Sequence, residues 1–200
     1  MNEWFQAFLL SFVPIFIAID ALALPPIIVS LAENLTAHER TKMVHLANLT
    51  ALLVGLAFLL FGQFILTVMG ISVGSFAIAG GLILLVQSIR NITVGRMIEA
   101  SVEEMVAVVP IGTPLLAGPA TITTLLLLLA QHPLSVVLVA FLVNVIVAWG
   151  ICLSSNRILK LMGRGGLRAI SRIFSLLLAA IAVSMILKGL GMVGLAQVIP

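Results

Sequence analysis

The sequence predicts an all-α membrane protein whose six transmembrane helices form two inverted three-helix repeats, each with a broken first helix. Three observations predict this fold class. The chain of 200 residues is 62% hydrophobic and only 8% charged, whereas soluble proteins carry about 25% charged residues. Its Lys and Arg residues gather in every second loop, and prolines interrupt the first and the fourth apolar segments.

Six apolar segments account for most of the chain. No Asp, Glu, Lys or Arg lies between Lys42 and Arg90, or between Glu104 and Arg157. Each of these gaps is long enough for two spans, since about 20 helical residues cross a bilayer. With one apolar segment nearer each end of the chain, they predict spans at residues 5–32, 43–68, 71–90, 105–130, 134–155 and 171–190.

The distribution of basic residues predicts the orientation of these spans. Lys or Arg occurs in loops 33–42, 91–104 and 156–170, but not in the short connections "GISVG" and "QHP". Because cytoplasmic loops are enriched in Lys and Arg, the three basic loops are expected in the cytoplasm. Both termini then lie outside, and the protein is expected to be a multi-pass protein of the cell inner (plasma) membrane.

The two halves of the chain show a weak internal repeat. Residues 19–31 ("IDALALPPIIVSL") align with residues 112–124 ("GTPLLAGPATITT"), and residues 77–85 align with 172–180 at nearly the same shift. A unit with an odd number of spans is turned upside down when it is duplicated. The single membrane domain is therefore expected to consist of inverted units 1–96 and 97–200, and inverted repeats with Pro- or Gly-interrupted helices are typical of secondary transporters.

Small residues indicate where helices approach one another closely. The third span contains "AIAGG" at residues 77–81, and the last span contains Ser175, Ala179 and Ala180. Small side chains let helix backbones pack closely in a membrane. These positions are expected at helix–helix contacts.

The first apolar segment carries a carboxylate and two adjacent prolines. Pro25 and Pro26 have no amide hydrogen, so each is expected to free a carbonyl four residues earlier, that of Ala21 and of Leu22. Free carbonyls at membrane depth are tolerated only where protein or a wet cavity covers them. Together with the carboxylate of Asp20, they suit a cation or an ammonium group.

The fourth apolar segment is interrupted by Pro114, Gly118 and Pro119. The sequence "ATITTL" that follows would begin a half-helix, and the amides and positive dipole end of a helix N-terminus suit a carboxylate. Thr121 and Thr123, with the neighbouring Thr124, can add hydroxyl groups. The two interrupted segments together are therefore expected to hold both ends of a zwitterion.

Several motifs resemble the MarC family, which is also described as a family of six-span neutral amino acid transporters. They are the first-span pattern at residues 19–30, "VVPIGTPLLAGPATITT", "IAGGLILL" and "LLLAAIAVSMIL", and the resemblance extends from about residue 8 to 191. It implies a six-span inner-membrane protein and, for at least some members, transport of small neutral amino acids such as glycine and alanine.

The chain departs from the family pattern at the first break. Where the family usually has Asp-Pro-Leu-Gly-Asn-Ile-Pro, this chain has Asp20 followed by Ala21, Leu22, Ala23 and Leu24 before its two prolines. It also has Ala77 where an Arg usually precedes "IAGG". The missing Asn removes a hydrogen-bonding amide from the expected site, so the departures bear on the choice of substrate.

The residues expected to bind substrate or a coupling ion follow from these patterns, and each has a structural alternative. The alternative for Asp20 is a helix cap or an ion pair with Arg172. The alternative for the two asparagines is hydrogen bonding between helices, and for Thr123 it is a hydrogen bond to its own helix. The candidates are Asp20, Leu22, Pro25, Pro26, Ser30, Asn48, Thr113, Pro114, Gly118, Pro119, Thr121, Thr123 and Asn144.

The expected function is ion-coupled transport by alternating access, with a proton or sodium as the coupling ion and no other cofactor or metal. An enzyme is not expected, because the chain has no H-E-x-x-H motif and no second intramembrane aspartate to act with Asp20. A channel, an exporter of another small solute and a structural membrane subunit stay as alternatives. The expected partners are membrane lipid and a small substrate, not nucleic acid, and small-residue faces would permit a homo-oligomer.

Overall fold

The computed structural model describes residues 3–33, 35–93 and 117–194, and every regular element within these ranges is helical. Five helical segments among them are long and apolar enough to cross a membrane, at Glu3–Val29, Ala37–Val68, Val73–Thr93, Leu134–Leu153 and Gly165–Met192. The elements in chain order are α1 (Glu3–Ile19), η1 (Ala21–Ala23), α2 (Leu24–Leu31), α3 (Ala37–Val68), α4 (Val73–Thr93), α6 (Pro119–Leu129), α7 (Leu134–Leu153) and α8 (Ser155–Met192).

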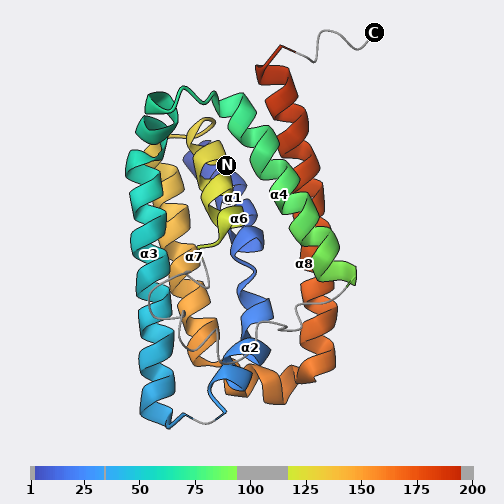
Figure 1. The fold of residues 1–200 in the computed structure, drawn as a ribbon. Helices are drawn as coiled ribbons and strands as arrows, with labels where there is room; N and C mark the ends of the chain where they lie inside the picture. The colour runs from blue at the N-terminus through green and yellow to red at the C-terminus, as the bar shows by residue number, and fades with distance from the viewer. Residues whose placement is uncertain (1–2, 34, 94–116, 195–200) are drawn as a thin grey trace.

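The helices form a bundle in which α1, η1 and α2 follow one another along the middle (Figure 1). α3 and α7 lie on one side of this central segment, and α4 and α8 lie on the other. The start of α1 and the end of α8 lie at the same end of the bundle. The end of α2, the start of α3 and the connection from α7 to α8 lie at the opposite end, whereas α4 ends partway toward it.

Two apolar clusters hold the bundle together. One joins buried residues of α1, α2, α3 and α7, including the large and fully buried Phe141, and the other joins residues of α1, α4 and α8. Residues of α6 belong to both clusters. α1 and α6 therefore lie where the two sides of the bundle meet.

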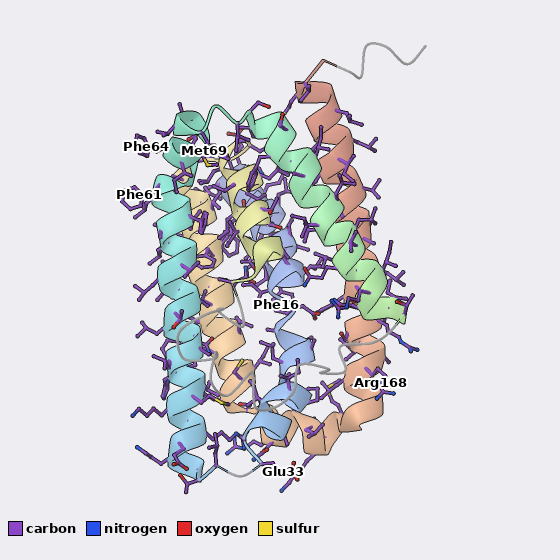
Figure 2. All side chains as sticks on the ribbon, in the orientation of Figure 1. Phe16, Glu33, Phe61, Phe64, Met69 and Arg168 are labelled. Atoms are coloured by element: carbon purple, nitrogen blue, oxygen red, sulfur yellow. The ribbon has the colours of Figure 1, made fainter. Side chains whose placement is uncertain are left out.

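Outside these clusters, large apolar side chains point away from the protein. Examples are Phe61 and Phe64 on α3 and Met69 just after it (Figure 2). Such a surface is unfavourable in water and favourable against lipid tails, which are as apolar as the side chains themselves. The exposed residues thus agree with the membrane location that the composition predicts.

The limits of α3 follow from its flanking residues. Thr36 and Glu39 form a capping box, in which the Glu39 carboxylate accepts from the Thr36 amide at 2.8 Å. At the other end Gly70 has a φ of 67°. Ile71 there donates to the carbonyl of Leu66 at 2.9 Å, which closes the helix in a Schellman motif. The capping box at the N-terminus explains why α3 begins six residues before the predicted span 43–68.

Close packing joins α4 to α8 through small residues. A Cβ on Gly81 would lie 2.8 Å from the Ala182 carbonyl, and one on Gly189 would lie 2.7 Å from the Gly74 carbonyl. The prediction for "AIAGG" is confirmed, since Ala77, Gly80 and Gly81 are buried. On the last span the prediction is wrong for Ala180, which is exposed, because the contact uses Ala182 and Gly189 instead.

The segment after α7 differs from the predicted loop 156–170. It is helical from Ser155, and α8 is interrupted only at Gly163, whose φ of 66° and ψ of 170° are not helical. The first part, residues 155–162, runs across the end of the bundle before the chain turns upward (Figure 1). Charge excluded this segment from the predicted span 171–190, but charge does not prevent a helix at the membrane surface.

The remaining predicted spans agree closely or lie outside the described residues. The predicted spans 71–90 and 134–155 correspond to α4 and α7. Of the predicted span 105–130, the described part is α6, which has only 11 residues.

Candidate functional site

The central helix breaks at Asp20. This residue has φ 48° and ψ 47°, the left-handed conformation, and is the single non-glycine residue with positive φ among those the structure describes. Aspartate adopts this conformation more readily than most residues, although at some cost. Strain of this kind persists where the surrounding packing imposes it, and it is frequent at functional sites.

The prolines do not form the break but follow it. Leu24 begins α2, so Pro25 and Pro26 lie in the first turn of a new helix, where a missing amide hydrogen costs no intrahelical bond. The expectation that Pro25 frees the Ala21 carbonyl is wrong. That carbonyl accepts from the Leu24 amide, because residues 21–23 tighten into a 3₁₀ turn.

Asp20 is deeply buried among apolar neighbours. Its side chain is 2% exposed, and Ile19, Ala21 and Leu24 around it are equally covered. The C-terminus of α1 directs its carbonyls, the negative end of the helix dipole, to the same place. A carboxylate and a helix C-terminus together make this region electronegative, which suits a cation or an ammonium group.

The start of α6 has the opposite polarity. Gly118 is its N-cap with extended backbone, Pro119 is its first residue, and the first intrahelical bond runs from the Ile122 amide to the Gly118 carbonyl at 3.1 Å. The amides of the first turn precede that bond and point out of the helix end. Amides and dipole at this end favour a negatively charged group.

Three threonine side chains in the first two turns of α6 are buried: Thr121, Thr123 and Thr124. The hydroxyl of Thr124 has no hydrogen-bond partner among the described residues. Thr123 packs against α4, because a Cβ on Gly80 would meet its Cγ2. Because Gly80 has no side chain, the first turns of α6 can pack closely against α4.

The break at Asp20 and the start of α6 lie together in the bundle. Ala117, just before α6, packs in one cluster with Ile19 and Ala21. Ala120, in the first turn of α6, packs in the other cluster with Ile17 and Ala18. Both regions lie partway along the bundle, away from its two ends (Figure 1).

Asn48 on α3 and Asn144 on α7 have matching environments. Both are 1% exposed, and each donates from Nδ2 to a carbonyl four residues earlier, Val44 at 2.8 Å and Ala140 at 2.9 Å. Neither Oδ1 has a partner among the described residues. They differ in their contacts across helices, since Asn144 also donates to the Phe12 carbonyl of α1 at 3.1 Å, whereas Asn48 meets the Cys152 thiol of α7.

The other predicted site residues are placed as follows. Leu22 and Pro26 are half-buried and Pro25 is buried at the start of α2. Ser30 belongs to α2, one residue before its end. Thr113 and Pro114 lie outside the described residues. The structure thus brings Asp20 and its neighbours together with Gly118 and Thr121, whereas Asn48 and Asn144 lie on the flanking helices.

Two polar features were not predicted as site residues. Ser11 on α1 is fully buried, and its hydroxyl has no partner in the described part of the chain. The sequence feature that could have indicated Ser11 is its polar side chain in an apolar segment, three positions before Pro14. In addition, Lys188 on α8 donates to the Gln131 side chain at 2.9 Å, which ties α8 to the end of α6. Neither partner of that pair can be recognised without the tertiary fold.

These features define a polytopic integral membrane protein with a polar centre enclosed by apolar helices. Comparison with known proteins gives the family. A model of the MarC family of integral membrane proteins matches residues 5–193, so the chain belongs to the MarC family. The resemblance that the sequence motifs indicated is confirmed.

Related proteins are similar over nearly their whole length. A UPF0056 membrane protein of Methanocaldococcus jannaschii is 35% identical, with 92% of this chain and 96% of the relative covered. The UPF0056 inner membrane protein YhgN of Escherichia coli is 32% identical, with 96% and 98% covered. No solved structure matches the chain.

Proposed function

We propose that this protein is a secondary transporter of small neutral amino acids, such as glycine and alanine, coupled to a proton or sodium gradient. The observation that carries the proposal is the juxtaposition of the break at Asp20 with the N-terminus of α6 at Gly118. Free backbone groups and a carboxylate are costly at membrane depth. Paired interrupted helices at the centre of a bundle are the arrangement that secondary transporters use to bind substrate.

The polarity of the two regions supports a zwitterionic substrate. The buried Asp20 carboxylate and the C-terminus of α1 favour an ammonium group. The N-terminus of α6 and the Thr121 hydroxyl favour a carboxylate. A short neutral amino acid carries these two charges on one carbon atom, so it would need both regions at once.

The paired helices support an inverted repeat of three helices in each half. α3 packs against α7 and α4 against α8, as an inversion relating the first half to the second would require. The contact of α4 with α6 has its counterpart in the contact of α8 with α2. Asn48 and Asn144 make the same bond on corresponding helices. In this proposal, one three-helix unit rocks against the other around the site.

The ends of the bundle support the orientation with both termini outside. Arg40 lies near the start of α3 and Arg157 near the start of α8, at the same end of the bundle, and Arg90 lies in the last turn of α4, the part of that helix nearest to this end. By the positive-inside rule this end faces the cytoplasm. The relative from Escherichia coli is named an inner membrane protein, which supports the same location for this chain.

Uptake by purified protein in proteoliposomes tests the proposal. Labelled glycine and alanine should accumulate saturably when a proton or sodium gradient is applied. Asp20→Asn keeps the size of the side chain but removes its charge, and it should lower uptake about tenfold or more, since hydrogen bonds to charged groups contribute about 1.5–3 kcal/mol. Ser88→Ala is the control, because Ser88 is also fully buried but bonds its own helix, to the Leu84 carbonyl at 2.7 Å.

Other outcomes would overturn the proposal in distinct ways. Flux that rises linearly with concentration and ignores both gradients would indicate a channel. Uptake that is the same in Asp20→Asn and in the wild type would exclude the proposed ammonium site. An absence of both uptake and amino acid-induced thermal stabilisation would favour a structural subunit.

A further inference from the structure

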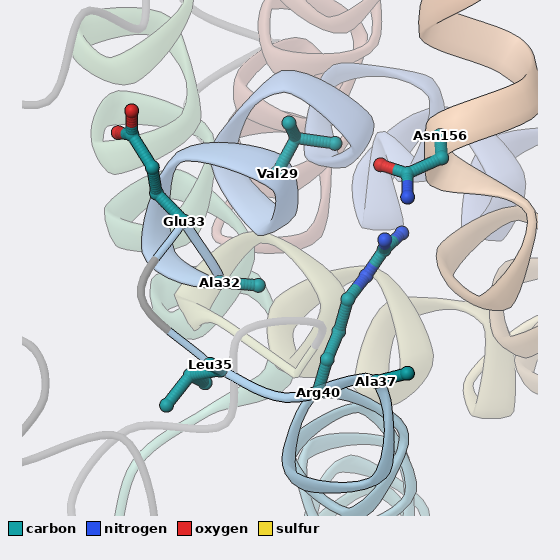
Figure 3. A pocket seen from close by; sticks show the side chains of 7 residues that line it. All are labelled: Val29, Ala32, Glu33, Leu35, Ala37, Arg40 and Asn156. Atoms are coloured by element: carbon teal, nitrogen blue, oxygen red, sulfur yellow. The ribbon is translucent and has the colours of Figure 1, made fainter.

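A pocket of about 430 Å³ lies at the end of the bundle that holds the basic residues. The end of α2, the loop after it, and the first turns of α3 and α8 surround the pocket (Figure 3). Its apolar wall includes Val29 of α2 and Ala32, the residue just after that helix. The volume is within the range of roughly 300–1,000 Å³ that is usual for pockets binding small molecules.

The side chains that can donate hydrogen bonds into the pocket are those of Arg40 and Asn156. The Arg40 side chain extends across the pocket toward Asn156 (Figure 3). Neither side chain has a hydrogen bond or an ion pair with any residue in the described part of the chain. A guanidinium and an amide that face one cavity offer several N–H donors in a small space, which suits the oxygen atoms of an anion.

The neighbouring carboxylates do not neutralise Arg40. Glu33 lines the pocket, but its carboxylate points away from Arg40 (Figure 3). Glu39 accepts from both the amide and the hydroxyl of Thr36, at 2.8 and 2.7 Å. The whole sequence after Glu104 contains no Asp or Glu, so the α8 side of the pocket, lined by Asn156, carries no negative charge. The local field therefore attracts an anion.

The helix beside the pocket places it at the membrane surface. Residues 155–162 run across the bundle end before the break at Gly163, and the membrane-spanning part of α8 begins at Gly165. Leu161 on this short helix is 88% exposed, while Arg157 and Lys160 are also exposed. A helix with apolar and basic residues on its surface lies in the interface between water and lipid tails.

We propose that the pocket binds the phosphate group of an anionic phospholipid, with Arg40 and Asn156 as its donors. The headgroup phosphate would accept from both side chains, and the glycerol and first acyl carbons would lie against Val29 and Ala32. Phosphate esters of lipids occur at the depth of this short helix, whereas free anions are not confined to it. The site is separate from the central site and does not depend on the proposed transport activity.

Lipid binding by the full-length protein tests the proposal. Purified protein in detergent is titrated with phosphatidylglycerol, phosphatidylcholine or inorganic phosphate, and binding is followed by native mass spectrometry and thermal stability. Phosphatidylglycerol should bind and stabilise the wild type more than the other two. Arg40→Gln should weaken that binding about fivefold, as expected for one arginine near an anionic membrane surface.

Matched variants separate the pocket from general surface charge. Arg90→Gln removes one exposed charge from the last turn of α4, outside the pocket, and it should bind phosphatidylglycerol like the wild type. If Arg40→Gln does not fold, Asn156→Ala provides the test, since it removes one donor from an exposed position. Equal weakening by Arg90→Gln, equal binding of phosphatidylcholine, or displacement of the lipid by millimolar inorganic phosphate would each overturn the proposal.

Discussion

The two regions that meet at the centre of the bundle are both helix ends, but they present opposite charge. At Asp20 the chain leaves α1 in a left-handed conformation, and a carboxylate joins the carbonyl end of the helix. At Gly118 the chain enters α6 from an extended conformation, and amides and threonine hydroxyls are presented. A single substrate with both charges would bridge the two regions, whereas an ion alone would need only one of them.

The largest expected effect separates the two charges of the substrate. In competition for alanine uptake, Asp20→Asn should lose its preference for compounds with an ammonium group, and Thr121→Val should lose part of its preference for a carboxylate. We expect changes of about tenfold for Asp20→Asn and less for Thr121→Val, because hydrogen bonds to charged groups contribute more than those of neutral hydroxyls.

The measurement uses analogues that keep one charge each. Ethylamine and propionate are added at increasing concentration to proteoliposomes that take up labelled alanine, and their inhibition constants are compared between variants. If both variants change the inhibition by ethylamine and by propionate in the same ratio, the two regions do not bind separate ends of the substrate.

A smaller effect is expected where α4 positions the start of α6. A Cβ on Gly80 would clash with the Thr123 methyl group, so Gly80→Ala should destabilise the protein by about 1–3 kcal/mol. Thr123→Ser removes that methyl group and keeps the hydroxyl, and in the double variant it should restore much of the lost stability.

Unfolding in detergent, followed by intrinsic tryptophan fluorescence, measures this coupling as a double-mutant cycle. Additive losses from Gly80→Ala and Thr123→Ser would show that these residues do not meet. Uptake can be measured on the same variants. A displaced α6 would weaken uptake although Asp20 and its neighbours are unchanged.

The residues around these regions also show what could be predicted from the sequence. The membrane class, most span positions and the special character of residues 19–31 follow from hydropathy, Asp20 and the two prolines. The position of the break does not follow from them. Local rules place a kink at Pro25 and Pro26, but the chain accommodates both in a first helical turn and bends at Asp20 instead.

Two further features depended on tertiary structure. Gly80 was expected at a helix contact, but that its partner is Thr123 depends on how α4 lies against α6. The helix at residues 155–162 was missed because hydropathy recognises spans, and a basic surface helix has no strong hydropathy signal. Sequence patterns thus indicated which segments are unusual, whereas packing decided which atoms meet.

The smallest expected effect distinguishes the two asparagines on the flanking helices. Asn48 bonds the Val44 carbonyl within α3 and reaches α7 only through the thiol of Cys152, a weak hydrogen-bonding group, whereas Asn144 connects α7 to α1 through the Phe12 carbonyl. Leucine has a similar volume and would leave no buried amide oxygen unpaired in either case. Asn144→Leu should therefore be less stable than Asn48→Leu by about 0.6 kcal/mol, the average for an interhelical hydrogen bond in a membrane.

The two variants are compared by unfolding in the same detergent, and their uptake is measured at a temperature where both are folded. Equal stability would mean that the bond to Phe12 contributes little to holding the central helix. A loss of uptake in both variants, without a matching loss of stability, would instead assign the two unpaired amide oxygens to the substrate or to the coupling ion. In that case the site would extend from the two helix ends to α3 and α7. The similar environments of Asn48 and Asn144 would then mean that each three-helix unit contributes one amide side chain to the site.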